Sequence, residues 1–334
     1  MTTIKDIARE ANVSSGTVDR VLHDRGGVST KTSERIKRIL KKKNFKINQI
    51  ASSLAMKKHL NLATLIPLYN DQNVFWRSPT SGIQKASQEV NANGVEINNF
   101  FFDQFDPINY IDTFNELIDS NPDALILAPI FVKETSIIIK SLNKRNTPFL
   151  FLNINQKGYN NLCYIGQKSF EGGSLAGQLL NLCTSTDDEL LIVQTRKNLE
   201  DYRSFSQRGK GFVDFFDKNN IKRSIHQIQF DGLKDQAKVR IKINSLLRLN
   251  KKIKGIVVPS SRASNIIELI HPDIQANIKV VGFDTTPKNV SALRKGQITF
   301  LISQKSFNQG YKSIITMVNY LIHKVKPEIE IPTP

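Results

Sequence analysis

The sequence predicts an α/β protein with parallel sheets in a large body and a small all-α helix-turn-helix domain at its amino end. Two observations lead to this prediction. From residue 60 onward, short apolar runs alternate with amphipathic helical patterns, which is typical of parallel sheets covered by helices on both faces. Before residue 60, short helical patterns follow one another in a strongly basic segment. A chain of 334 residues is long enough for more than one domain.

The first 22 residues show two short helical patterns separated by a tight turn at Asn12 and Val13. Apolar residues repeat at helical spacing in both, and Ser14 is placed to cap the second helix. The inward positions are Ile4, Ile7, Ala8, Ala11, Val18, Val21 and Leu22. The outward face of the second helix carries small or hydrogen-bonding residues, which suit base edges and phosphates. An ordinary helical hairpin would show the same pattern, so this segment alone leaves both interpretations open.

A third helix is expected from a cap at Ser29 or Thr30 to Lys43, with Ile36 and Ile39 facing inward. Its outer side is rich in lysine and arginine, as is the whole segment. Residues 1–60 hold 14 Lys or Arg against 5 Asp or Glu, which is +9 of the total charge of +17. Such a basic head suits attraction to nucleic acid phosphates. A solvated helix face is the alternative explanation of the lysine cluster.

Residues 47–58 connect this head to the body and are small, polar and weakly helical. A helix this short is not stable alone in water, but it could fold when a partner covers it. Leu54, one turn after Ile50, would then be a candidate wedge into a step of the DNA minor groove. A plain linker is the alternative.

The body shows apolar strands that alternate with helices. The expected strands are residues 62–67, 95–101, 124–129, 149–153, 190–194, 255–259 and 279–284. Helical patterns include residues 106–119, 131–145, 205–219, 261–270 and 306–324. Ligands of parallel α/β folds bind at the carboxyl ends of the strands. This rule points to Asn153, Ser260, Ser261 and Asp284, which lie at or just after strand ends.

With these pieces the whole chain resembles the LacI/GalR family of bacterial transcription regulators. The resemblance is carried by T-I-K-D-I-A-R-E-A-N-V-S-S-G-T-V-D-R-V-L (residues 3–22), by V-S-T-K-T-S-E-R-I (residues 28–36) and by Asn44 and Phe45. It implies a two-lobed body similar to the type I periplasmic sugar-binding proteins. The implied divisions are a DNA-binding domain at 1–46, a hinge at 47–58 and an effector-binding and dimerisation domain at 59–334. The N-lobe is expected at about 59–165 and 305–325, and the C-lobe at about 166–304 and 326–334.

The resemblance also implies which residues contact DNA. Ser15, Gly16 and Arg20 match positions that read bases, whereas Ser14, Thr17 and Thr32 match positions that touch phosphates. Asn48 and Ala51 match the start of the hinge, and Leu54 matches the leucine that levers open the central operator step. Two departures matter: Gly16 has no side chain with which to read a base, and Asp19 replaces the usual serine. Direct readout is therefore expected to depend on Ser15 and Arg20.

The implied effector site lies in the body. Its expected residues are Phe75, Trp76, Asn153, Arg208, Ser260, Asp284 and Gln304. Carboxylate and guanidinium groups bind hydroxyls strongly, and flat rings cover the apolar face of a sugar. The segment P-S-S-R (residues 259–262) lacks the Asn-Asp pair of many sugar binders, and Ser206 replaces a second arginine. We expect a sugar or sugar derivative, on analogy to the fold.

These expectations combine into a ligand-responsive transcription regulator, expected to be a repressor, that binds a palindromic operator as a homodimer. Its partners would be double-stranded DNA and a small polar effector. Neither a cofactor nor a metal site is expected, because Cys163, Cys183 and five scattered histidines show no ligand spacing. No apolar run is long enough to span a membrane and the first residues do not suit a signal peptide. A cytoplasmic, nucleoid-associated protein is therefore expected.

Two rival classes explain less of the sequence. An exported solute-binding receptor accounts for the body but not for the basic head. A metabolic enzyme on a doubly wound fold would account for the strands and helices. However, the chain lacks G-x-G-x-x-G after its first strand, G-x-x-x-x-G-K-[ST], H-E-x-x-H and G-x-S-x-G. The glycines of E-G-G-S-L-A-G (residues 171–177) are expected to allow close helix packing instead. We therefore do not expect an enzyme.

Replacing Leu54 with glycine removes the expected wedge. We predict that specific operator binding weakens far more than non-specific binding, because only the operator offers the step that the leucine opens. Titrations of the full chain with operator and with unrelated duplex measure the two affinities. An equal loss on both duplexes would exclude this role for Leu54.

Overall fold

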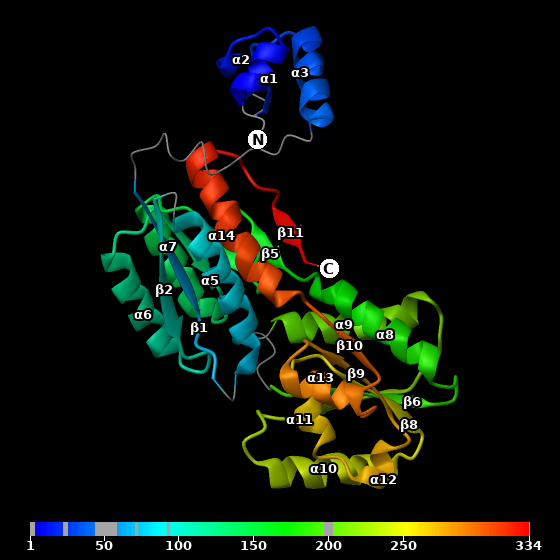
Figure 1. Cartoon of the computed structure of the whole chain (residues 1–334). Coiled ribbons are helices and arrows are strands. Elements are labelled where there is room, and N and C mark those ends of the chain that lie inside the picture. Colours follow the sequence, from blue (N-terminus) through cyan, green and yellow to red (C-terminus); the bar gives the residue numbers. More distant parts are fainter. Residues whose placement is uncertain are drawn as a thin grey trace. The chain divides into compact units, whose positions relative to one another are not determined.

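The chain divides into two units, which are described separately below. They comprise residues 1–58 with 321–325, and residues 59–320 with 326–334. The computed structural model describes residues 4–22, 26–43, 59–70, 73–91, 94–196 and 203–333. The expected hinge with Asn48, Ala51 and Leu54, and the pair Asn44 and Phe45, lie outside the described residues, as do the side chains of Ile4 and Asp19. Figure 1 follows the chain in sequence order, with each element labelled where there is room.

The amino-terminal unit contains the three helices that the sequence predicts. They are α1 (Ile4–Glu10), α2 (Ser15–Leu22) and α3 (Thr30–Lys42). Asn12 makes the turn at φ 47°, a left-handed conformation that asparagine tolerates well. Ser14 and Ser29 cap α2 and α3, because their hydroxyls accept from the N–H groups of Thr17 at 3.1 Å and Thr32 at 3.3 Å. The buried core is Ile7, Ala8, Ala11, Val18, Val21, Ile36 and Ile39.

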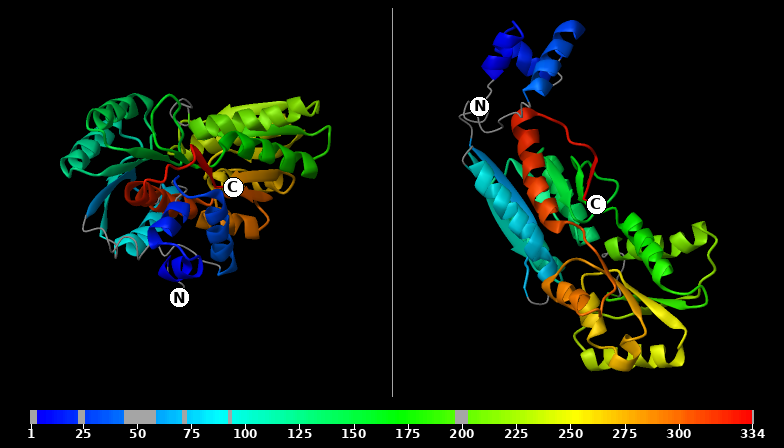
Figure 2. Two further views of the ribbon diagram at one scale, coloured as in Figure 1. Left: turned by 90° about the horizontal axis from the view of Figure 1, so that it is seen from above. Right: turned by 45° about the vertical axis from the view of Figure 1, so that its right-hand side comes forward.

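The first lobe of the body contains a sheet of six parallel strands with the order β11-β5-β4-β3-β1-β2. Its strands are β1 (Leu60–Pro67), β2 (Val95–Phe102), β3 (Ala124–Leu127), β4 (Phe149–Leu152), β5 (Tyr164–Gly166) and β11 (Glu330–Pro332). The covering helices are α5 (Arg77–Asn91), α6 (Pro107–Asp119), α7 (Val132–Lys144) and α14 (Ser306–His323), and a short 3-10 turn, η1 (Val74–Trp76), precedes α5. Figure 2 shows that α14 (orange to red) runs beside α5 (cyan).

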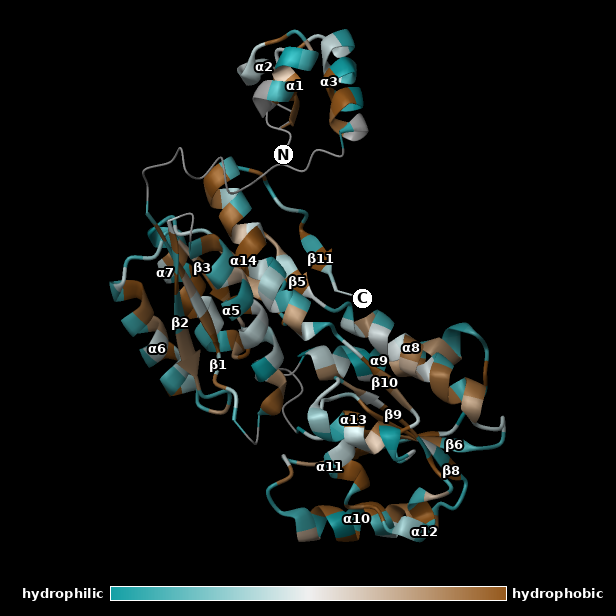
Figure 3. Cartoon of the chain, viewed as in Figure 1, coloured by the Kyte–Doolittle hydropathy of each residue, from teal (hydrophilic) through white to brown (hydrophobic). Residues whose placement is uncertain are grey.

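The second lobe contains five parallel strands with the order β10-β9-β8-β6-β7. They are β6 (Glu189–Gln194), β7 (Ile225–Gln229), β8 (Ile253–Val258), β9 (Lys279–Phe283) and β10 (Phe300–Ile302). The helices are α8 (Ser169–Cys183), α9 (Arg203–Lys218), α10 (Gln236–Leu249), α11 (Ala263–Ile267), α12 (Pro272–Gln275) and α13 (Pro287–Arg294). Individual helices such as α10 carry both hydrophobic and hydrophilic residues (Figure 3), as expected where one face covers a sheet.

The carboxyl-terminal segment differs from the sequence prediction. We expected residues 326–334 in the second lobe, but β11 pairs in parallel with β5, with Ile331 beside Ile165. In addition, the N–H of Thr333 donates to the carbonyl of Gly166 at 3.1 Å. The segment therefore belongs to the first lobe, where it covers the otherwise open edge of β5. The helix expected at residues 261–270 is also shorter, since α11 ends at Ile267.

Glycines bring two pairs of helices into close contact. A Cβ on Gly173 of α8 would lie 2.0 Å from the carbonyl oxygen of Arg208, and one on Gly211 of α9 would lie 2.0 Å from that of Phe170. A Cβ on Gly82 of α5 would likewise lie 2.0 Å from the carbonyl oxygen of Phe307 in α14. The expected close packing at residues 171–177 is confirmed. Its consequence is that the backbone at Arg208 is fixed against α8.

No helix among the described residues combines the length and the apolar character that crossing a membrane requires.

We predict that Gly173→Ala destabilises the body by about 1–3 kcal/mol, because the added methyl meets the Arg208 carbonyl and forces the helices apart. Urea unfolding of the full chain measures the change. Gln178→Ala on the exposed side of the same helix is the matched control and should change stability by less than about 0.5 kcal/mol. Stability of Gly173→Ala equal to that of the unmodified protein would contradict the packing argument.

Candidate functional site

The body contains a cleft of about 1270 Å³ whose walls come from both lobes. The residues that follow strands of both sheets face it, including Gln104 after β2, Ile130 after β3, Ser261 after β8 and Thr286 after β9. This is the place at which parallel α/β folds bind ligands. The seven predicted effector residues, Phe75, Trp76, Asn153, Arg208, Ser260, Asp284 and Gln304, all line this cleft. The structure thus brings them together, while their contact with a ligand stays a prediction.

Phe75 and Trp76 form an aromatic wall on the first-lobe side. Their rings meet edge to face with centroids 5.5 Å apart. Trp76 is only 3% exposed, and its carbonyl accepts a hydrogen bond from the hydroxyl of Thr80 at 2.7 Å. Asn73 holds the start of the turn by donating to the carbonyl of Leu68 at 3.0 Å. Because Trp76 is the more buried of the two, Phe75 offers more ring surface to a ligand.

A chain of amides links the two lobes across the cleft. The Asn153 side chain after β4 donates to Gln304 Oε1 at 3.3 Å and to Gln309 Oε1 at 2.9 Å. Gln304 in turn donates to Asp284 Oδ1 at 2.6 Å. Gln309, which has no exposed surface, donates to the carbonyl of Gln304 at 2.9 Å and to the hydroxyl of Thr333 at 3.0 Å. The orientation of the Gln304 amide is therefore fixed from both sides.

Asp284 and Arg208 are the two buried charged groups of this site. Burial raises the pKa of the Asp284 carboxyl, against the opposing effects of Arg208 and of the Gln304 hydrogen bond. Burial lowers the pKa of the Arg208 guanidinium, and Asp284 opposes that change. Arg208 donates to the carbonyl of Pro259 at 2.9 Å and to Gln167 Oε1 at 3.0 Å, and its guanidinium lies 4.3 Å from the ring centroid of Phe283. The two groups thus offset part of each other's burial cost.

Asn289 is a positioning residue that sequence reasoning missed. Its fully buried amide donates to the carbonyls of Ser261, Phe283 and Asp284 at 2.9–3.0 Å, and its oxygen accepts from the N–H of Ser264 at 2.9 Å. One side chain therefore holds the loops after β8 and β9. This matters because Asp284 sits at φ 70°, a left-handed conformation that is uncommon for residues other than glycine. A single buried asparagine gives no periodic signal in the sequence.

Ser260, which lies just after β8, lines the cleft on the second-lobe side. It is buried, and its hydroxyl lies 3.1 Å from that of Thr195 after β6. Arg196 follows Thr195 in the chain, and its backbone carbonyl accepts a hydrogen bond from the Gln229 amide at 2.9 Å. Gln229, Thr195 and Gln167 are further supports that the sequence did not single out.

The amino-terminal unit presents the predicted DNA-contact residues on α2 and α3. Ser15, Gly16 and Arg20 are exposed, and the nearest atom to a Cβ on Gly16 would be the Ser14 hydroxyl at 3.8 Å. The hydroxyls of Ser14 and Thr17 lie 2.9 Å apart, as do those of Ser29 and Thr32. The surface around Gly16 thus carries small side chains, which suits close approach to a groove. Contact with DNA stays a prediction.

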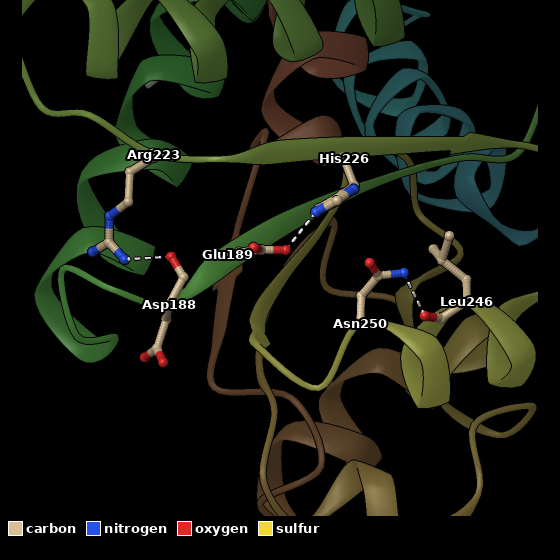
Figure 4. A network of polar contacts seen from close by, with 6 residues as sticks. All are labelled: Asp188, Glu189, Arg223, His226, Leu246 and Asn250. Carbon is tan, nitrogen blue, oxygen red and sulfur yellow. Dashed lines mark hydrogen bonds and ion pairs between the residues drawn. The ribbon is translucent and has the colours of Figure 1, made fainter.

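A second polar cluster lies at the opposite ends of the second-lobe strands, away from the cleft. Glu189 and His226 at the starts of β6 and β7 are 2.6 Å apart (Figure 4). Arg223 donates to carbonyls just after α8, including that of Asp188 at 2.9 Å, and such a cation suits the negative end of a helix. No group of three metal-ligating side chains occurs in the described part of the chain. We interpret this cluster as structural.

Comparisons with known proteins agree with this architecture. Residues 63–324 match the family described as the periplasmic binding protein domain, and residues 3–48 match the bacterial regulatory proteins of the lacI family. Catabolite control protein A of Staphylococcus xylosus is 29% identical over 156 residues, which cover 46% of this chain and 45% of that protein. The match to the Staphylococcus epidermidis protein of the same name is 29% over 147 residues, or 44% of this chain and 42% of that one. The matched segments thus span less than half of these relatives.

Solved structures share the fold of the body. A Bacteroides fragilis protein assigned to the LacI transcriptional regulators superposes with a TM-score of 0.76 at 22% identity, over 83% of this chain and 96% of that one. A periplasmic sugar-binding protein of Legionella pneumophila gives a TM-score of 0.69 at 19% identity, over 82% of this chain and 98% of that one. At this identity the likeness concerns the fold alone.

We predict that Asn289→Ala lowers the free energy of unfolding by about 3 kcal/mol, because the four backbone groups that this side chain bonds in the loops after β8 and β9 lose that hydrogen bond. Urea unfolding measures the loss. Asn250→Ala is the control: this half-buried amide bonds a single carbonyl, that of Leu246 at 2.9 Å (Figure 4), and its loss should cost about 1 kcal/mol. Equal costs for the two variants would contradict the positioning role of Asn289.

Proposed function

The chain belongs to the family of periplasmic binding protein domains and carries an amino-terminal segment of the lacI family of bacterial regulatory proteins, and from this premise we propose that it is a ligand-responsive transcription regulator. The observation that carries the proposal is the pairing of a helix-turn-helix unit with a cleft that gathers polar side chains from both lobes. The family and the relatives indicate a DNA-binding regulator rather than an enzyme.

The amino-terminal unit is proposed to bind DNA through α2 in the major groove. Arg20 and Ser15 would read base edges, and Ser14, Thr17 and Thr32 would bind phosphates. Its basic character supplies the non-specific part of the affinity, which should fall as salt rises. Residues 47–58 are proposed to act as the hinge, with Asn48 and Ala51 at its start and Leu54 at the minor groove. Operator binding would place the protein at the nucleoid.

The functional form is proposed to be a homodimer on a palindromic operator, since two identical heads then meet two identical half-sites. A ligand in the cleft would contact both lobes and so favour one arrangement of them over another. Only a difference in affinity between the two arrangements can change operator binding. We propose a repressor, in keeping with the resemblance that the sequence shows.

The ligand is proposed to be a small polar molecule of the sugar class. Asp284 and Asn153 would bind hydroxyls from opposite lobes, and Phe75 would cover an apolar face. Arg208 and Gln304 fix the orientation of Asp284 and would add donors, while Ser260 and Trp76 complete the walls. A periplasmic sugar-binding protein among the solved structures shares this fold, which is consistent with the proposal.

The test combines DNA selection with a cleft variant. Operator DNA is first selected from random duplexes by the full chain, and its affinity is then measured with and without sugars that raise the melting temperature. We predict that Asp284→Asn weakens ligand binding by about 10-fold to 100-fold, because it removes a charged acceptor. Affinity for the operator without ligand should not change, since the asparagine can still accept from Gln304.

Asp273→Asn is the matched control, because this carboxylate is highly exposed and does not line the cleft. It should leave both ligand binding and operator binding unchanged. A ligand midpoint that is the same in Asp284→Asn and in the unmodified protein would remove Asp284 from the site. Failure to select any duplex would overturn the regulator proposal.

A further inference from the structure

We propose that the cleft takes an anionic ligand, such as a sugar that carries a phosphate or a carboxylate, and that cations of the second lobe bind its charge. This inference deepens the ligand site of the proposed function and rests on it. It is carried by the number, placement and support of the charged residues that face the cleft.

The described residues that line the cleft are unequal in charge. Six are cationic and three are acidic: Arg196, Arg208, Lys234, Arg240, Arg262 and Lys288 against Asp231, Glu268 and Asp284. Their balance is +3, whereas residues 61–334 together carry only +8. More than a third of the excess charge of the body therefore lines this one cleft. A general basicity of the protein does not account for that concentration.

The order of the strands in the second sheet explains why these cations lie close together. Arg196, Lys234 and Arg262 come after β6, β7 and β8, and Lys288 lies in α13 after β9. These four strands are adjacent, in the order β9-β8-β6-β7. Each strand thus delivers one cation to the same edge of the sheet. Convergent positive charge in a cleft raises the local concentration of anions.

The excess of positive charge in the cleft does not come from its two deeply buried charged residues. Arg208 and Asp284 interact with each other, as the opposing effect of each on the other's pKa shows. One positive and one negative charge at the base of the cleft leave the +3 balance in the outer part. A ligand that presents its hydroxyls to Asp284 would therefore present its charged group to the outer cations.

Arg196 is held in place rather than free to swing into solvent. Its backbone carbonyl accepts from Gln229, and its guanidinium lies 4.6 Å from the ring centroid of Phe105 in the first lobe. One guanidinium nitrogen would be 3.2 Å from a Cβ on Gly232, so the glycine makes room for it. Nearby, Arg262 donates to the carbonyl of Thr195 at 3.4 Å. Two guanidinium groups supported at adjacent strand ends suit a planar, multi-oxygen anion.

The segment after Arg196 does not reverse this balance. Residues 197–202 contain two acids, Glu200 and Asp201, and one lysine. Counted in full with the lining residues, they leave the balance at +2. The positive sign therefore does not depend on how that segment is placed.

The test uses the full chain and inorganic phosphate as the first probe, at constant ionic strength set with sodium chloride. The variant is Lys234→Gln with Lys288→Gln, two exposed lysines of the cleft whose loss leaves the core intact. The matched control is Lys252→Gln with Lys295→Gln, which removes the same charge from exposed positions off the cleft. We expect phosphate to raise the melting temperature of the unmodified protein and of the control, and to bind the cleft variant about tenfold more weakly.

A second arm compares glucose, glucose 6-phosphate and glucuronate by calorimetry, which distinguishes a phosphate from a carboxylate as the preferred group. Tighter binding of either anion than of glucose, with loss of that preference in the cleft variant, supports the proposal. A phosphate effect that is absent, or equal in the three proteins, overturns it, as does glucose binding as tightly as both anions. Duplex binding is measured separately, so a neutral ligand that still controls DNA would leave the regulator proposal standing.

Discussion

The arrangement of the cleft depends on the hydrogen-bond chain from Asn153 through Gln304 to Asp284. It begins at a strand of the first lobe and ends at a strand of the second, with donor-acceptor distances of 3.3 and 2.6 Å. Each amide has a defined direction, because the carboxylate can only accept and the asparagine nitrogen can only donate. Buried polar groups are costly unless all are satisfied, so Gln309, which completes the chain from behind, is as necessary to it as the residues that face the ligand.

The Gln304 hydrogen bond also helps the body to tolerate buried charge at this point, because it opposes the rise in the pKa of the Asp284 carboxyl. Asp284 and Arg208 are kept in a setting that opposes ionisation of both, as their shifted pKa values indicate. Proteins accept such strain at binding sites and offset it elsewhere. Here the offset comes from Asn289, which fixes the loops after β8 and β9, and from the glycine contacts that hold α8 against α9. Charge in the cleft and close packing behind it are thus parts of one arrangement.

Much of this could be predicted from the sequence, for physical reasons. The seven expected strands are all present because long apolar runs can only be buried, and the caps at Ser14 and Ser29 follow from hydrogen-bonding needs of helix ends. The rule that ligands of parallel α/β folds bind at the carboxyl ends of the strands pointed to Asn153, Ser260 and Asp284, and all three line the cleft. Three-residue strands such as β5, β10 and β11 are too short to show a pattern, which is why the position of residues 326–334 was wrong. The roles of Asn289 and Gln309 were not predicted, because a single buried amide residue cannot be distinguished in the sequence from one on the surface.

The pairing of β11 with β5 has a consequence for anyone who engineers this protein. Thr333 contacts both Gly166 and Gln309, and Gln309 in turn orients Asn153 at the cleft. Two hydrogen bonds thus connect Thr333 to Asn153, a residue that lines the cleft, so an affinity tag, reporter or linker fused after this strand would act on that path. Fusions after β11 should therefore be separated from Thr333 by a flexible spacer, so that the pairing of this strand with β5 is kept.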